Sequence, residues 1–172
     1  SILSIITGAT IADEESFTFD LTQYFQSVAC DAPGGPIAFN PPRHRRFDSQ
    51  GRRLIWISDN WLQGSKGASF AAREEFSRVV GEHGIVPTLE DPSVYVWIAS
   101  DGTLRFSLHG DDGIGSSSSL RMVKALHDII RSRWPDVKFL YDWGDAIGFL
   151  VERYRERRMT VISAPKHIAA LE

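Results

Sequence analysis

The amino-acid sequence predicts an α+β fold, with a mixed and mostly antiparallel sheet of hairpins and with helices packed on one of its faces. Short segments that alternate apolar and polar residues across turn signals predict the hairpins, and longer segments with apolar residues at helical spacing predict the helices. A strand–helix–strand order near the C-terminus is typical of a right-handed βαβ unit. With 172 residues, 42% of them hydrophobic, we expect a single globular domain over residues 1–172.

The first half of the chain is predicted to contain strands, loops and one long helix. Residues 2–11 and 17–21 are expected to be strands joined by a turn, and residues 22–29 a short helix. Proline and glycine predict a loop over 31–46, with a short strand at 37–39. A hairpin turning at 49–51 should lead into a buried strand at 54–58, and apolar spacing predicts a helix over 68–83 that is capped by Gly84.

The clearest local structure lies in residues 94–134. Two alternating segments, 94–99 and 104–109, flank a turn in which Gly102 is free to adopt a positive φ. A loop rich in Gly, Asp and Ser follows, with serines that can cap the next helix. An apolar stripe then predicts an amphipathic helix that ends before Pro135.

The closing segment supplies the predicted βαβ unit. Residues 137–141 and 159–163 are expected to be strands, and residues 145–158 a helix whose inward face carries four apolar or aromatic side chains. These four are Ile147, Leu150, Val151 and Tyr154. A crossover of this kind would make the two strands parallel.

Charge and cysteine content narrow the functional classes. The formal net charge of −3 gives no support for wide electrostatic binding to nucleic acid. The lone Cys30 excludes an intramolecular disulfide and fits a reducing compartment. No segment approaches the length of an apolar membrane span, so we expect a soluble, cytoplasmic protein. Ser1 in place of Met suggests a tag remnant or processing, and the acidic first 42 residues are expected to face one of the later arginine clusters.

Two loops carry the residues of a candidate metal site. If the strands before these loops are parallel neighbours, the loops meet at one edge of the sheet, where open sheets usually bind ligands. Carboxylates with one imidazole suit Mg²⁺, Mn²⁺ or Ca²⁺, and such an ion can bind a phosphate ester. The alternative is two unrelated polar loops, with Asp145 capping a helix. The candidate ligands are His109, Asp111, Asp112, Asp142 and Asp145.

A second set of residues is suited to binding anions. Arginines offer paired donors to phosphate or carboxylate, and a Gly-rich chain entering a helix can direct free N–H groups at an anion. A nearby aromatic such as Phe47 or Trp56 could stack on a base. The alternatives are a solvated arginine hairpin and a loop whose serines only cap the helix. The candidates are Arg43, Arg45, Arg46, Arg52, Arg53, Ser116 and Ser117.

The sequence favours a binding protein over an enzyme. It contains no HExxH, no GxSxG and no Gly-Lys-Ser/Thr phosphate loop. We therefore expect a non-catalytic module without a cofactor that binds another protein, as a small inhibitor, immunity-type or regulatory protein would. Its candidate aromatic surface comprises Trp61, Trp97 and Trp143, although large aromatics are usually core residues. The alternative is a metal-dependent enzyme acting on a phosphorylated or nucleotide-like substrate; nucleic-acid binding ranks third, and no membrane partner is expected.

Overall fold

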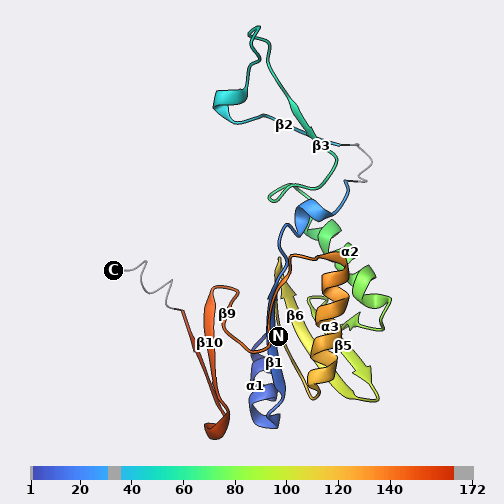
Figure 1. Cartoon of the computed structure of the whole chain (residues 1–172), viewed down its shortest axis with the longest axis vertical. Helices are drawn as coiled ribbons and strands as arrows, with labels where there is room; N and C mark the ends of the chain where they lie inside the picture. Colours follow the sequence, from blue (N-terminus) through green and yellow to red (C-terminus); the bar gives the residue numbers. More distant parts are fainter. Residues whose placement is uncertain (1, 31–35, 165–172) are drawn as a thin grey trace. The chain divides into compact units, whose positions relative to one another are not determined.

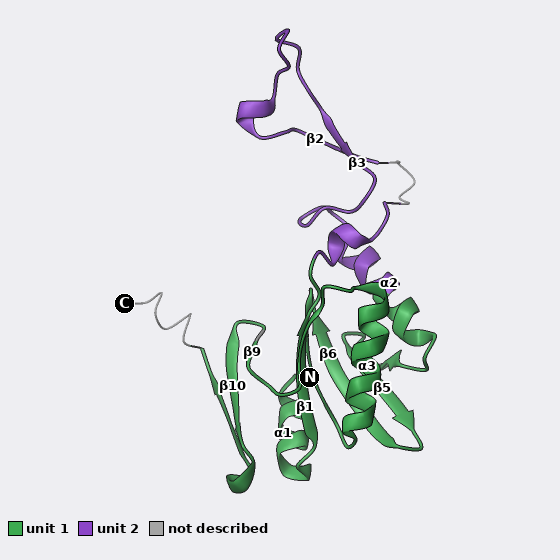
Figure 2. Cartoon of the chain, in the orientation of Figure 1, with its two compact units in different colours: residues 1–22, 76–172 green, residues 23–75 purple. Residues whose placement is uncertain are grey.

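The computed structural model of the chain describes residues 2–30 and 36–164. Two compact units are present (Figure 2). Unit 1 comprises Ser1–Thr22 and Phe76–Glu172, and unit 2 comprises Gln23–Glu75. The helices and strands confirm the α+β class (Figure 1).

The main sheet of unit 1 has six strands in the order β4-β5-β6-β7-β1-β8, and all neighbouring strands are antiparallel. The predicted hairpin of β5 and β6 is confirmed, with Gly102 at a φ of 138°. Both edge strands are very short. The strands are β1 (Glu15–Asp20), β4 (Val86–Pro87), β5 (Val94–Ala99), β6 (Gly102–His109), β7 (Asp112–Ser117) and β8 (Lys138–Leu140).

Strand β7 occupies most of the segment that was predicted to be a Gly-, Asp- and Ser-rich loop. It pairs with β6 on one side and with β1 on the other, so that Ser16 lies opposite Ser116. The loop prediction is therefore wrong for residues 112–117. The physical reason is that Gly113 and Gly115 lie beneath the rings of Phe19 and Phe17, where any side chain would collide with an aromatic ring.

One face of the sheet packs against α3 (Leu120–Arg133) and against the part of α2 (Ala68–Gly81) that belongs to unit 1, from Phe76 onward (Figure 1). The rings of Phe19 and Phe106 lie 6.3 and 6.0 Å from the ring of Phe76 in α2. Helix α3 buries Leu126 and Ile130. Both helices were predicted, although α2 ends two residues earlier than expected.

The opposite face is covered by α1 (Ile2–Ala12), so the prediction that the helices share one face is wrong. Ile114, which alternates with the two glycines of β7, packs here with Ile6 and Ala9. The strand predicted over residues 2–11 is also wrong. Burial of Ile5, Ile6 and Ala9 along one helical stripe outweighs the β-propensity of the isoleucines.

The C-terminal segment forms a second antiparallel sheet, in the order β11-β10-β9. Its elements are β9 (Asp145–Ala146), β10 (Phe149–Tyr154), the 3₁₀ helix η3 (Arg155–Arg157) and β11 (Met159–Ser163). The predicted helix over 145–158 and the parallel βαβ unit are therefore wrong. Ile147 and Gly148 both have positive φ, at 54° and 78°, and form the two-residue turn of a hairpin between Ala146 and Phe149.

Unit 2 contains the hairpin of β2 (Ile37–Phe39) and β3 (Trp56–Ser58), with the 3₁₀ helices η1 (Phe25–Ser27) and η2 (Arg43–Arg45). The turn at 49–51 is confirmed, and η1 is the only helical part of the predicted helix 22–29. The strand at 54–58 is not buried as predicted, since Ile55 and Ile57 are 60% and 69% exposed. Part of the predicted loop, residues 31–35, and Ser1 lie outside the described residues.

Candidate functional site: an apolar pocket beside α1

A pocket with a volume of about 330 Å³ lies on the α1 face of unit 1. This volume is at the lower end of the range typical of ligand pockets. Its lining is entirely apolar and comes from α1, β7 and the second sheet: Ile2, Leu3, Ile6, Ile114, Ile147, Phe149, Val151 and Ile162.

The pocket has a buried floor and an exposed rim. Ile6, Ile114 and Val151 form the floor and belong to an apolar cluster with Ala9 and Trp143. Leu3, Phe149 and Ile162 stand at the rim, with exposed fractions of 64%, 43% and 41%. An apolar group that enters would therefore remove mainly the surface of the rim from water.

Ile147 lines the pocket from a backbone conformation that β-branched residues rarely adopt. Its φ of 54° lies in the left-handed region, where a residue other than glycine typically costs about 1–3 kcal/mol. The turn would accept asparagine at this position with little strain. The chain thus has a strained isoleucine at a position where the side chain lines the pocket.

Arg153 fixes the second sheet to α1. Its side chain is 3% exposed, and its guanidinium donates to the carbonyl of Ala9 at 3.0 Å, to Asp13 Oδ1 at 2.9 Å and to the carbonyl of Glu14. The same group lies 5.5 Å from the ring of Trp143. A cation at the end of a helix is favourable because the last carbonyls carry partial negative charge.

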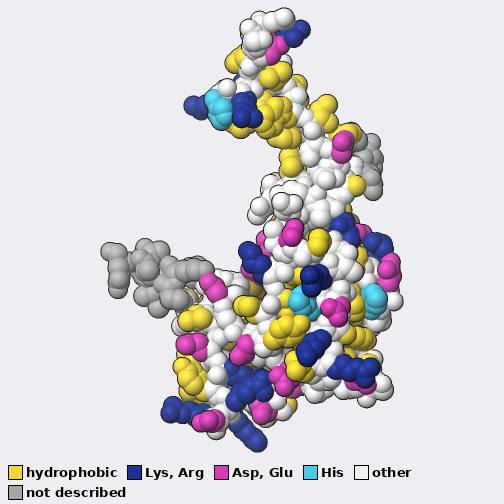
Figure 3. Space-filling model, viewed as in Figure 1, with side chains coloured by type: hydrophobic (Ala, Val, Ile, Leu, Met, Phe, Trp, Pro, Cys, Tyr) yellow, Lys and Arg dark blue, Asp and Glu magenta, His cyan; other side chains and the backbone are white. Residues whose placement is uncertain are grey.

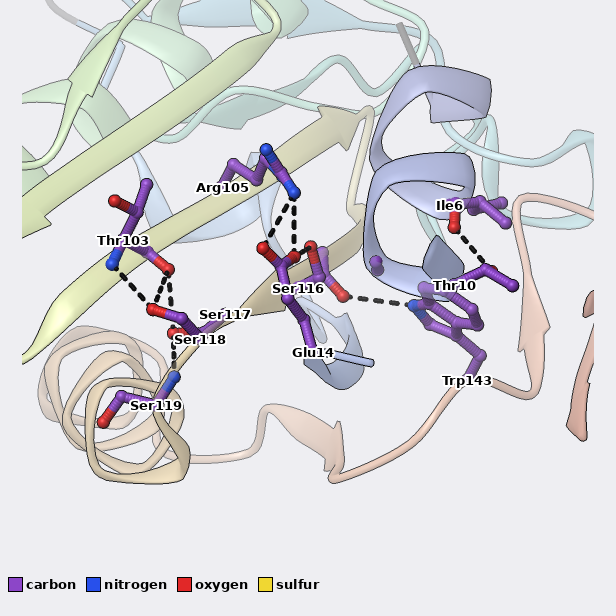
Figure 4. Close-up of polar contacts among 12 residues, drawn as sticks. Ile6, Thr10, Glu14, Thr103, Arg105, Ser116, Ser117, Ser118, Ser119 and Trp143 are labelled. Atoms are coloured by element: carbon purple, nitrogen blue, oxygen red, sulfur yellow. Dashed lines mark hydrogen bonds and ion pairs between the residues drawn. The ribbon is translucent and has the colours of Figure 1, made fainter. Parts of the chain in front are cut away.

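A second polar cluster lies at the start of β1 (Figure 4). Arg105 Nη2 donates to both carboxylate oxygens of Glu14 at 2.9 Å, and Ser116 Oγ donates to the same carboxylate at 2.7 Å. Trp143 Nε1 donates to the carbonyl of Gly115 at 3.1 Å. These bonds hold the walls of the pocket in place without a ligand.

The ion pairs of Arg153 with Asp13 and of Arg155 with Glu15 confirm that the acidic N-terminal region faces an arginine cluster. The sequence signal was the contrast between an early stretch without Lys or Arg and the four arginines at 153–158.

Two of the predicted metal ligands come together. Asp112 and Asp145 line one cavity of about 200 Å³, together with Asp20 and Lys138. Lys138 Nζ forms an ion pair with Asp20 at 2.9 Å, so part of the negative charge is already compensated. Within residues 2–30 and 36–164, no three His, Cys, Asp or Glu side chains are grouped so that they could hold a metal ion.

The other predicted ligands do not line this cavity. His109 ends β6 in an exposed position, and Asp111 lies in the turn before β7. Asp142 accepts hydrogen bonds from Ser16 Oγ and from the backbone N–H of Trp143, both at 2.8 Å.

Asp112 is electrostatically unfavourable as an anion. Partial burial raises its pKa above the ordinary value of 3.8, and the charges of Asp111 and Asp20 raise it further. The backbone N–H of Ile147 acts in the opposite direction by donating a hydrogen bond to this carboxyl group.

The predicted anion-binding residues separate into two groups. Ser116 and Ser117 are buried in β7, where their hydroxyls donate to Glu14 and to the carbonyl of Thr103. They lie in a strand and not in the loop where an anion cradle was expected. The five arginines Arg43, Arg45, Arg46, Arg52 and Arg53 are all exposed and lie between β2 and β3 in unit 2.

The three predicted tryptophans do not form one surface. Trp61 belongs to unit 2, where its ring lies so close to Gly67 that a Cβ atom added there would be 3.2 Å from it. Trp97 is on the sheet face that carries Phe106, because it lies opposite Leu104, whereas Trp143 is buried on the α1 face. Trp143 is therefore a core residue that supports the pocket.

The pocket was not predicted, because the segments that line it were assigned the wrong secondary structure. Only Gly148 gave a sequence signal for the turn before Phe149, because an isoleucine at position 147 is disfavoured in a two-residue hairpin turn. No helix within the described parts of the chain is long and apolar enough to cross a membrane. Comparison with known proteins found no family model that matches the chain and no match among curated proteins.

Proposed function

We propose that the protein is a binding module that recognises another protein, and that the apolar pocket beside α1 receives an apolar side chain of this partner. The observation that carries the proposal is Ile147, a strained β-branched residue whose side chain lines a pocket with an exposed rim. Strain of this kind tends to be retained where function requires it.

The geometry of the pocket suits the anchor of a protein interface. Such anchors are a few well-packed side chains that enter desolvated pockets, with less critical contacts around them. A buried Leu, Ile or Phe side chain contributes about 1.5–3 kcal/mol. The buried polar contacts of Arg153 and Glu14 support a pocket that exists before the partner arrives, which lowers the cost of binding.

The test is selection of binding peptides from a random displayed library on the immobilised protein, followed by calorimetry with the enriched peptides. We expect these peptides to share an apolar anchor residue. The Leu3→Ser variant should weaken their binding by about tenfold, which corresponds to about 1.4 kcal/mol of lost contact.

The matched control is Ile98→Ser, which removes an aliphatic side chain that is 78% exposed on β5 and does not line the pocket. Binding by this variant should stay within twofold of the unmodified protein. Peptides that bind the Leu3→Ser protein as tightly as the unmodified protein would remove the pocket from the proposal.

A further inference from the structure

The segment between β2 and β3 in unit 2, residues 40–55, carries a concentrated positive charge. It contains five arginines and a single acidic residue, Asp48. The whole of Gln23–Glu75 has seven Lys and Arg against five Asp and Glu, whereas the remainder of the chain has 12 against 17. The protein as a whole has a net charge of −3, but this segment of it is basic. Figure 3 shows the basic side chains gathered where unit 2 carries η2 and the turn.

These arginines are mostly available to a ligand. Asp48 pairs with Arg52 at 2.7 Å, and it also accepts the backbone N–H groups of Gln50 and Arg52. Within residues 2–30 and 36–164, Arg46 and Arg53 donate to neutral oxygens, those of Pro41 and Asn40. Arg43 and Arg45 have no carboxylate partner among the described residues.

Arg46, Arg52 and Arg53 flank the turn, whereas Arg43 and Arg45 lie in the 3₁₀ helix η2. Phe47 and Arg53 form a bridge, the N–H of Leu54 donates to the carbonyl of Arg46 at 2.8 Å, and Asp48 closes the turn. Below the turn, the rings of Phe39 and Trp56 meet edge to face at 5.9 Å, which joins β2 to β3.

An aromatic side chain accompanies the charge. Phe47 is 62% exposed and follows Arg46 directly in the chain. Guanidinium groups bind phosphate oxygens in pairs, and an exposed ring can stack on a base. Arginines beside an exposed ring are the combination found on surfaces that bind single-stranded nucleic acid.

We infer that residues 40–55 form a nucleic-acid-binding arm, in which the arginines contact the phosphate backbone and Phe47 contacts a base. This function is separate from the proposed protein-binding pocket, which lies in unit 1 and shares no residue with the arm.

The test is fluorescence anisotropy of a labelled single strand and a labelled duplex of equal length, titrated with the full chain at several salt concentrations. In the Arg43→Gln/Arg45→Gln variant we expect about tenfold weaker binding at low salt. A plot of the logarithm of the binding constant against the logarithm of the salt concentration has a negative slope. In the variant this slope should become less steep by about 1.4 for a single strand, or about 1.8 for a duplex. Labelled poly-glutamate of the same length serves as a competing acidic polymer.

Two further variants separate charge at this position from charge in general. Lys124→Gln/Arg131→Gln removes two exposed charges from α3 and should bind as the unmodified protein does. Arg43→Lys/Arg45→Lys should retain most of the salt dependence, because lysine keeps the charge. Circular dichroism confirms that each variant is folded.

Three outcomes would overturn the inference. The first is no binding of either nucleic acid at low salt. The second is equal loss of affinity in the η2 and α3 variants. The third is binding of poly-glutamate at least as tight as that of the nucleic acids, which would assign the arm to an acidic protein partner instead.

Discussion

Gly113 and Gly115 are the residues that allow the aromatic core to approach the sheet. A Cβ atom at Gly115 would lie 2.6 Å from the carbonyl oxygen of Arg105 and would also collide with the ring of Phe17. Neither glycine has a positive φ, so their role is one of space and not of backbone conformation. A glycine repeated every second residue in a strand marks such a close approach.

We predict that Gly115→Ala lowers the free energy of unfolding by about 1–3 kcal/mol, because the added methyl group overpacks the core. The measurement is urea denaturation followed by circular dichroism. Gly81→Ala is the control: a Cβ atom there meets nothing within 4 Å, and alanine is the better helix former. A Gly115→Ala protein as stable as Gly81→Ala would show that the aromatic layer adapts easily.

Because the pKa of Asp112 is raised, we expect the stability of the protein to depend on pH. Its pKa in the folded state is raised above 3.8, so the folded state binds more protons than the unfolded state between that value and the raised pKa. Ionisation of Asp112 therefore lowers stability as pH rises through this interval. Below 3.8 the group is protonated in both states and the penalty disappears.

We predict that Asp112→Asn raises the melting temperature at pH 7 and that this gain vanishes below pH 3.8. Thermal melting of both proteins over a pH series measures the difference. A gain that is the same at every pH would point to packing and not to charge.

Ile147 has both a strained backbone and a side chain that lines the pocket. We predict that Ile147→Asn leaves the free energy of unfolding within about 1 kcal/mol of the original value, because relief of the left-handed strain offsets the lost apolar contact. The same variant should weaken anchor-peptide binding about tenfold. Denaturation and calorimetry together check both effects, and a large loss of stability would instead make Ile147 a purely structural residue.

At the scale of elements, α1 and the second sheet depend on each other. Arg153 of β10 satisfies the carbonyl of Ala9 in α1, and the hydroxyls of Thr10 and Thr160 are 2.6 Å apart between α1 and β11. The two elements also share apolar contacts, since Ile6 of α1 and Val151 of β10 belong to one cluster.

We predict that Arg153→Gln lowers the free energy of unfolding by about 2 kcal/mol, because hydrogen bonds from charged groups contribute about 1.5–3 kcal/mol each and the carbonyls of Ala9 and Glu14 lose a charged donor. Arg157→Gln, at an exposed position, is the matched control and should change stability by less than about 0.5 kcal/mol. Chemical denaturation measures both. Equal effects would mean that the contacts of Arg153 contribute little.

The elements that sequence predicts well are those stabilised by local patterns. The β5–β6 hairpin has its own turn and alternation, and α3 has a complete apolar stripe with Pro135 after it. The elements predicted wrongly, α1 and β10, take their structure from distant contacts. Ile6 faces Ile114 and Arg153 reaches Asp13, and neither contact leaves a trace in local periodicity.

The candidate sites follow the same division. The arginine segment was visible because its residues are neighbours in the sequence, whereas the pocket draws on residues from position 2 to position 162. Asp112 and Asp145 line one cavity, but no sequence pattern indicated that Asp20 and Lys138 line it too, because the pairing of β1 with both β7 and β8 joins segments that are far apart in the chain.

At the scale of the whole molecule, protection from hydrogen exchange should follow the sheet. We predict the slowest amide exchange in β1, β6 and β7, which are interior strands with buried side chains, and fast exchange in residues 43–53, which are almost entirely exposed. Exchange measured by mass spectrometry on the intact chain tests this. Strong protection of residues 43–53 in the free protein would mean that the arm is already covered.

The two edge strands of the main sheet limit association between molecules of the protein. An unpaired strand edge is a template for adding another chain, and long apolar edges lead to aggregation. Here one edge is only Val86–Pro87, where proline offers no N–H, and the other is three residues long and begins with the charged Lys138. Replacing both Pro87 and Lys138 with valine should promote association of sheets from different molecules, seen as light scattering that grows with protein concentration.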